Sequence, residues 1–292
     1  MSRRSLALSL LLASSLFGCS DHVDPTLSIP VALAVVSGDG QTGMPGAELA
    51  SPLVARVEDS RGRGVPSQIV NFRVVQGGGT VFAGAAITNR DGIARERWTL
   101  GTSGPQRVEA RAVDPETGAA LTFAVFNATL LPIPVTVTRA GTGSGTVTSE
   151  PAGIACGTTC SASFTAGSTV TLTAAAEPFS TFTGWSGDCS GTGACVVTAD
   201  AAKSVTATFV RQTFALTVMR TGDGAVTSSP AGISCGVSCS EVLDGGTVVT
   251  LTAVPFTGYH FLNWTGAVGG TTNPVVLVGV ATDMTVVANF AQ

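Results

Sequence analysis

The chain has 292 residues, of which 12% are charged, and its formal net charge is −4. A general nucleic-acid-binding protein would show a basic excess, so the composition argues against that class of partner. Charges, Gly and Pro interrupt every apolar run beyond the first residues, which predicts globular domains rather than membrane spans.

The first residues have the layout of a secretory signal. Arg3 and Arg4 precede an apolar run over residues 6–17, which ends in small residues. This run is shorter than the roughly 20 residues that a spanning helix needs. Leu16-Phe17-Gly18-Cys19 then resembles a bacterial lipobox, although Phe17 stands where that motif has a small residue. The resemblance implies a lipoprotein signal peptide over residues 1–18 and a membrane partner reached through a lipid on Cys19.

The alternative is ordinary cleavage after Ser20, which would discard Cys19 with the signal. Because Ser20 rather than Asp follows Cys19, resemblance to the Gram-negative sorting rule implies the outer membrane, if the host is Gram-negative. Residues 19–30 are polar and contain Pro, so we predict a short tether there.

Residues 31–131 alternate between short apolar-patterned strands and turns rich in Gly, Asp and Asn. The alternating sets are Leu53, Ala55, Val57; Val70, Phe72, Val74; Ala94, Trp98, Leu100; Val108, Ala110, Ala112; and Leu121, Phe123, Val125. About seven strands in about 100 residues predict a β-sandwich. The stretches 52–66, 70–80 and 88–95 resemble, in order, the bacterial Ig-like domain group 1 of invasin- and intimin-type adhesins. That resemblance implies an Ig-like fold and a spacer or adhesive role.

One local charge imbalance lies inside this segment. Between Arg56 and Arg111 there are nine Arg against five acidic residues. The simpler interpretation is a solvated strand face, because alternation sends these side chains outward. The alternative is a weak contact with an anionic partner such as lipopolysaccharide or an acidic glycan.

The C-terminal half is an internal repeat, which we place at residues 133–210 and 213–292. Residues 149–157 match residues 228–236 at an offset of 79, and the closing segments 205–209 and 286–290 match at an offset of 81. Residues 143–147, 182–189 and 203–209 resemble the divergent B-repeat of internalin-type surface proteins. The resemblance implies small β-grasp-like or all-β modules with no known chemistry.

Seven cysteines in an exported chain leave one over, and lipidation of Cys19 would account for it. The second repeat keeps Cys235 and Cys239 but lacks counterparts of Cys189 and Cys195, so the missing two were paired with each other. The comparison favours the disulfides Cys156–Cys160, Cys189–Cys195 and Cys235–Cys239. A zinc site built from Cys156, Cys160 and Cys189 is the alternative, but no His accompanies it.

No constellation with catalytic chemistry is evident. His22 lies in the tether, and His260 has no partner suggested by the sequence. Trp185 and Trp264 recur at equivalent positions of the two repeats, where they either fill the module cores or stack on a carbohydrate ligand. We expect no enzyme activity, no metal and no cofactor.

The expected protein is therefore all-β: an Ig-like sandwich followed by two small β-rich repeats. Its expected function is that of a surface-tethered structural or adhesive module array. The alternative is a binding protein with a defined glycan or protein ligand on the C-terminal repeats. The oligomeric state is left open.

Overall fold

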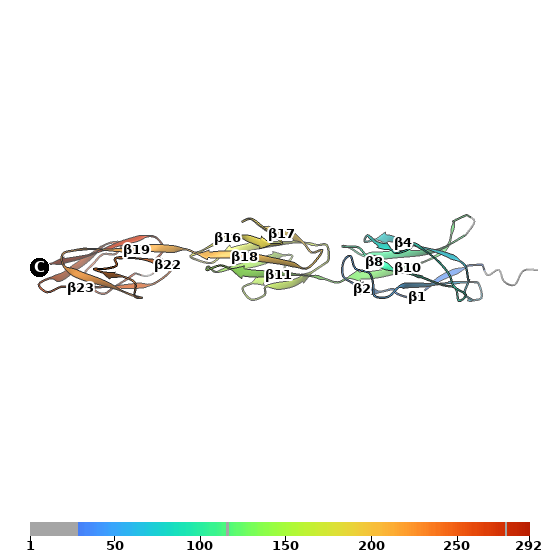
Figure 1. Cartoon of the computed structure of the whole chain (residues 1–292), viewed down its shortest axis with the longest axis horizontal. Helices are drawn as coiled ribbons and strands as arrows, with labels where there is room; N and C mark the ends of the chain where they lie inside the picture. Colours follow the sequence, from blue (N-terminus) through green and yellow to red (C-terminus); the bar gives the residue numbers. More distant parts are fainter. Residues whose placement is uncertain (1–28, 115–116, 278) are drawn as a thin grey trace, which may run out of the picture.

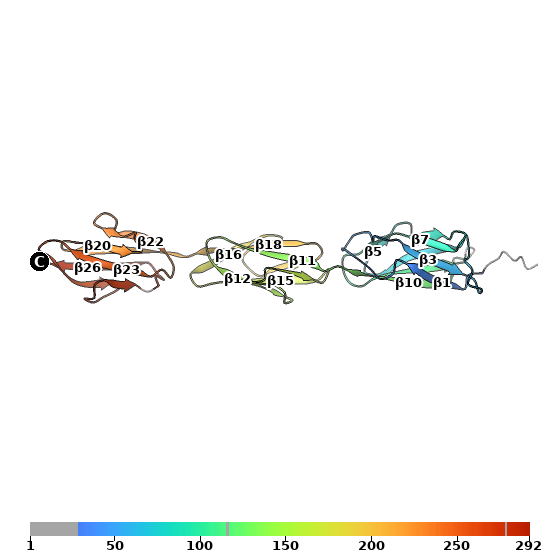
Figure 2. The same ribbon diagram turned by 90° about the horizontal axis from the view of Figure 1, so that it is seen from below.

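A computed structural model of the chain describes residues 29–114, 117–277 and 279–292. The predicted signal, Cys19 and nearly all of the tether at 19–30 lie outside these residues. Three β-sandwiches follow one another in chain order and form a rod (Figure 1). The view turned by a right angle has the same straight arrangement (Figure 2). We call them module 1 (β1–β10), module 2 (β11–β18) and module 3 (β19–β26).

Module 1 is a β-sandwich with one core. Its sheets have the orders β1-β3-β7 and β2-β10-β9-β4-β6, with β5 and β8 as a separate pair. The strands are β1 (Ala32–Ser37), β2 (Gln41–Gly43), β3 (Leu53–Glu58), β4 (Ile69–Gln76), β5 (Gly79–Val81), β6 (Ala85–Ile87), β7 (Ile93–Glu96), β8 (Trp98–Leu100), β9 (Gln106–Val113) and β10 (Ala120–Leu130). Leu53, Trp98 and Phe126 are fully buried between the sheets, so apolar burial without a disulfide holds this module together.

The prediction of which side chains of β10 face the core was wrong. Phe123 is 60% exposed, whereas its neighbours Ala124 and Phe126 point into the core. The pairing of β10 with β9 shifts between Ala120 and Thr122. Beyond this shift, Ala124 and Phe126 pair with Ala110 and Val108, which are buried on β9, so this row of β10 faces the core.

Modules 2 and 3 share one topology of two four-stranded sheets. The sheet orders are β14-β11-β18-β16 and β13-β12-β15-β17 in module 2, and β22-β19-β26-β24 and β21-β20-β23-β25 in module 3. The strands of module 2 are β11 (Ile133–Ala140), β12 (Gly145–Glu150), β13 (Ala155–Cys156), β14 (Ser161–Phe164), β15 (Thr169–Ala176), β16 (Ser180–Gly187), β17 (Cys195–Thr198) and β18 (Lys203–Arg211). Those of module 3 are β19 (Thr213–Thr221), β20 (Gly224–Ser229), β21 (Ser234–Cys235), β22 (Ser240–Asp244), β23 (Val249–Pro255), β24 (His260–Gly266), β25 (Val275–Leu277) and β26 (Met284–Ala291).

The all-β prediction is confirmed, because the described residues form strands and no helix. Of the two forms expected for the repeats, the structure has the all-β one, since no described helix packs on a sheet as in a β-grasp. For the same reason, the described residues include no helix long and apolar enough to cross a membrane.

The sequence of β11 illustrates why these segments form strands. Ile133, Val135 and Val137 are buried, while the alternate residues are exposed and include Thr136 and Thr138. β-Branched residues on both faces favour the extended backbone, and Thr keeps the outer face polar without charge. The low charged content of the chain follows from outer faces of this kind.

The connections between modules are very short. β10 ends at Leu130 and β11 begins at Ile133, while only Gln212 separates β18 from β19. Each module nevertheless has its own core of buried residues. Leu130 packs against the cores of modules 1 and 2, so the first two modules are in apolar contact.

Candidate functional site

The two tryptophans that the sequence singles out lie in the module cores. Trp185 on β16 is 6% exposed, and Trp264 on β24 is 1% exposed. Each indole packs against the Phe three residues before it, with ring centroids 5.0 Å apart for Phe182–Trp185 and 5.1 Å apart for Phe261–Trp264. The same Phe also contacts a third ring, with centroids 5.4 Å apart for Phe182–Phe209 and 6.0 Å apart for Phe261–Phe290, so each repeat has a three-ring aromatic cluster in its core.

The indole N–H groups are also satisfied within the modules. Trp185 Nε1 donates to the carbonyl oxygen of Gly193 at 2.7 Å, and Trp264 Nε1 donates to that of Thr272 at 3.1 Å. With both rings buried and both donors used, neither Trp presents a face on which a sugar could stack. Of the two alternatives for Trp185 and Trp264, burial fits the filling of the module cores and gives no support to a carbohydrate contact.

Three disulfides join the six cysteines of modules 2 and 3. The pairs are Cys156–Cys160, Cys189–Cys195 and Cys235–Cys239, with Cα–Cα distances of 4.2, 5.9 and 4.3 Å. They are the pairs that the comparison of the repeats favours. The alternative zinc site has no thiolates left, because all three of its sulfurs are in disulfides.

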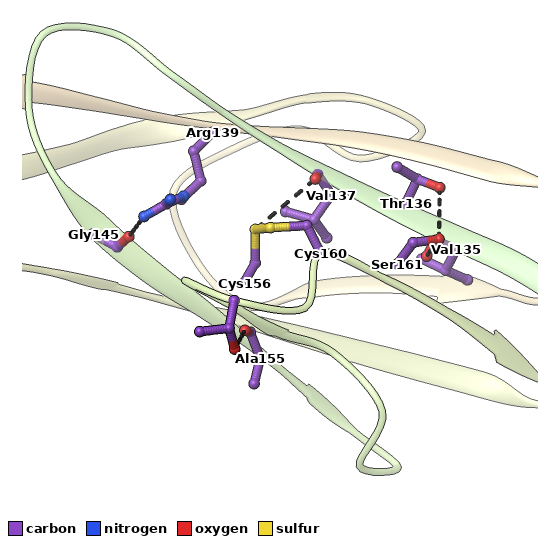
Figure 3. The surroundings of a disulfide bond; sticks show 10 residues. Val135, Thr136, Val137, Arg139, Gly145, Ala155, Cys156, Cys160 and Ser161 are labelled. Atoms are coloured by element: carbon purple, nitrogen blue, oxygen red, sulfur yellow. Dashed lines mark hydrogen bonds between the residues drawn. A yellow bond between two sulfur atoms is a disulfide. The ribbon is translucent and has the colours of Figure 1, made fainter.

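The Cys156–Cys160 disulfide attaches a loop to the edge of strand β11 (Figure 3). The backbone N–H of Val137 donates to the carbonyl oxygen of Cys160 at 2.8 Å, and Cys156 Sγ lies 4.0 Å from the carbonyl oxygen of Val137. Module 3 repeats this arrangement, with Val218 and Cys239 in the same roles at 2.7 Å. The disulfide therefore fixes where the chain returns to the sheet after β13.

A hollow of about 500 Å³ opens beside this disulfide, at the end of β11. Arg139 lines it and donates from its guanidinium to the carbonyl oxygen of Gly145 at 2.8 Å, which bridges the two sheets (Figure 3). The other lining residues are Val137, Thr138, Ala140, Gly141, Gly143, Ser144, Gly145, Cys160 and Phe209. Of these described residues none is a carboxylate, an imidazole or a free thiol, so the lining itself supplies no general base for a hydroxyl nucleophile.

Several charged residues of module 1 are paired with neighbouring groups. In the turn after β3, Asp59 accepts hydrogen bonds from the backbone N–H groups of Arg61 and Arg63 at 2.8 and 3.0 Å. The Arg63 backbone donor is the largest cause that lowers the pKa of Asp59 to about 2. Arg56 and Arg97 pair with Glu58 and Glu48 at 2.9 and 3.3 Å. These pairs fit the interpretation of this Arg-rich segment as a solvated face.

The two histidines are not brought together with acidic or nucleophilic groups in the described chain. His260 is an exposed residue of β24 whose imidazole makes no hydrogen bond or ion pair with any described residue. His22 lies outside the described residues. Across the described ranges, no group of three or more His, Cys, Asp or Glu side chains is placed to hold a metal ion.

Sequence reasoning missed three residues that the structure makes prominent. Arg139 and Arg220 both bridge to a Gly of the following strand, and their recurrence at the ends of the opening strands was the available signal. Phe179 adopts a left-handed backbone with φ of 60°. The position aligned with it in the second repeat is Gly258, which was the signal for an unusual backbone there.

Fold and repeated core together define a tandem β-sandwich repeat protein. Residues 135–213 and 214–292 each match the model of the divergent InlB B-repeat domain. These matches cover more than half of the chain, and the protein belongs to this family. No curated protein matches the chain.

Among solved structures, the chain is similar to a C-terminal fragment of intimin bound to the translocated intimin receptor. The identity is 13%, the TM-score is 0.26, and the match covers 63% of this chain and 65% of the fragment. The major pilin of Streptococcus pyogenes matches with 10% identity and a TM-score of 0.29, over 54% of this chain and 95% of the pilin. The D0–D1 domain of intimin matches with 12% identity and a TM-score of 0.24, over 87% and 98% of the two chains.

Proposed function

We propose that the protein is an exported lipoprotein that serves as a surface-tethered structural or adhesive array without enzyme activity. In this proposal Cys19 carries the anchor, residues 19–30 form the tether, and modules 1 to 3 extend away from the membrane in chain order. The outer membrane is the proposed location for a Gram-negative host. Module 3 is then the part best placed to touch a glycan or protein partner on another surface.

The observation that carries this proposal is the linear arrangement of three separately packed modules (Figure 1). Because the chain enters each repeat at one pole and leaves it at the other, adding a module adds length rather than bulk. The hollow beside the Cys156–Cys160 disulfide is lined by no described carboxylate, imidazole or free thiol. The buried tryptophans give no support to sugar stacking.

The anchor is tested by mass spectrometry of the protein recovered from the membrane fraction. We expect a mature chain that begins at Cys19 and carries acyl chains, because stable anchoring needs more than one chain. A Cys19→Ala variant should move to the soluble fraction, while a Ser20→Ala variant should stay with the membrane. An unmodified chain that begins after Ser20 would overturn the anchor and leave export intact.

The spacer role is tested on intact cells with a small epitope placed after Gln292 or inserted in the Asp114–Ala119 turn of module 1. A rod that stands away from the membrane predicts stronger antibody access to the distal epitope than to the proximal one. Equal access to both epitopes in anchored protein would contradict the proposed orientation.

A further inference from the structure

Both repeats present the same turn to the module that precedes them. The turn spans residues 165–168 between β14 and β15, and residues 245–248 between β22 and β23. A Cβ atom built on Gly167 would lie 2.2 Å from Ser103 Cβ of module 1. The equivalent Gly246 faces Phe179 of module 2. The two junctions therefore use one repeat-encoded surface, which we call the docking turn.

At the second junction the docking turn lies directly on an aromatic ring. A Cβ atom on Gly245 would come within 2.7 Å of Phe179 Cβ. On Gly246 it would come within 3.0 Å of the ring carbons Cδ2 and Cε2 of Phe179. Real Cβ atoms keep larger distances, so two successive glycines are what allow the ring to lie this close.

Phe179 is held in a backbone conformation that bulky residues avoid. Its φ is 60°, in the left-handed region. It lies in a turn closed by the Ser180 N–H donating to Glu177 O at 3.0 Å, and the matching turn of module 3 has Tyr259 donating to Phe256 O at 3.0 Å. There the equivalent residue is Gly258, whose φ is 87° and whose Cβ position has nothing within 4 Å. The strained Phe179 is thus present in module 2, where the next module docks. In module 3, no described residue lies against the equivalent position, and that position is a Gly.

The single linker residue is bound to both modules. The N–H of Gln212 donates to the carbonyl oxygen of Phe179 at 2.8 Å, and its own carbonyl oxygen accepts from the N–H of Gly245 at 2.9 Å. Its side-chain amide donates to Thr181 Oγ1 at 3.1 Å. The nearby Arg211–Asp244 pair, at 3.6 Å and about half exposed, adds little. With both backbone groups of Gln212 used, the linker has little freedom to bend.

We infer that the pole of module 2 formed by Phe179 and Gln212 is a docking surface for the Gly245–Gly246 turn of a following repeat. Docking there holds modules 2 and 3 at one fixed angle, and Phe179 is the residue that sets it. The first junction uses the same turn against Ser103, but an apolar hollow of about 430 Å³ remains beside it, lined by Pro105, Leu130, Pro132 and Ala166. The docking of module 3 on module 2 does not depend on whether Cys19 carries a lipid.

The test is the distance distribution between spin labels on the full exported chain, measured by pulsed electron paramagnetic resonance. The labels are placed on noncanonical residues at Val196 of module 2 and Val276 of module 3, which are 59% and 51% exposed. The parent chain should give one narrow distribution. Gly245→Ala should broaden it, because the new Cβ meets Phe179 while the backbone φ is ordinary.

Gly269→Ala is the matched control, since this glycine of module 3 also has an ordinary φ and its Cβ would meet only Trp264 O at 3.8 Å. It should leave the distribution narrow. Phe179→Gly removes the ring and the strain together, so it should broaden the distribution while amide exchange in both modules stays as slow as in the parent. A broad distribution in the parent, or a narrow one in both Gly245→Ala and Phe179→Gly, would overturn the inference. So would equal broadening by Gly269→Ala.

Discussion

At the scale of single residues, polar side chains of the described chain bond mainly to nearby backbone groups. Asp59 closes its own turn with two backbone hydrogen bonds and an ion pair to Arg63 at 2.8 Å. Trp185 and Trp264 donate their indole N–H groups to carbonyls eight residues further along. Side chains used in this way fix turns and cores, and they leave few groups poised for chemistry.

Asp59 gives a prediction for the pH dependence. Its folded pKa of about 2 lies below the ordinary 3.8, because backbone N–H donation from Arg63 favours the carboxylate. The stabilisation of the folded state by the Asp59 carboxylate is therefore complete above the ordinary pKa, and it is lost as the pH falls towards 2. A carboxyl-carbon NMR titration should find the low pKa, and Arg63→Ala should retain much of the lowering, since its backbone donor remains. An ordinary pKa in the parent chain would contradict this account.

Trp264 gives a prediction for stability. Replacing this fully buried side chain by Ala should lower the stability of module 3 by about 3–5 kcal/mol, because a large cavity remains in the core. Amide exchange of β26 is the measurement. Met219→Ala, at a position 56% exposed in the same module, is the control and should change the stability by less than about 0.5 kcal/mol.

At the scale of elements, the strands of the chain were largely predictable, because period-two alternation of apolar residues is visible in the sequence. Val108, Ala110 and Ala112 face inward as expected. The inner row of β10 was not predictable from alternation, since Phe123 and Phe126 offer two competing inward rows, and the pairing of Phe126 with buried Val108 on β9 decides between them. The contact of Phe179 with the next module was also beyond sequence reasoning, because it depends on which poles meet.

The disulfides give a prediction at this scale. Each of the Cys156–Cys160 and Cys235–Cys239 bridges spans a separation of only four residues. Closing so short a loop contributes roughly 2 kcal/mol. Replacing either pair by Ala should therefore lower the free energy of opening, measured by amide exchange in β11 or β19, by roughly 2 kcal/mol and leave the module folded. Complete unfolding of one module would show that its bridge does more than pin a turn.

At the scale of the whole molecule, three cores with short connections predict unfolding in more than one step. Each core is closed by its own residues, and Leu130 alone is shared between the first two. Calorimetry should give a measured enthalpy larger than the van't Hoff value, which is the sign of separate cooperative units. Gly245→Ala should separate the transitions of modules 2 and 3 further. A single two-state transition would contradict the independence of the cores.

The pairing of the first and last strands in each repeat has a mechanical consequence. β11 and β18 run parallel over six residue pairs, from Val135–Lys203 to Ala140–Thr208, and β19 and β26 do the same in module 3. The chain enters through the first strand at one pole and leaves through the last strand at the other. Tension along the axis therefore drags the two neighbouring strands past each other, and their hydrogen bonds share the load in shear instead of opening one at a time. This arrangement suits each repeat to carry tension along the axis of the rod.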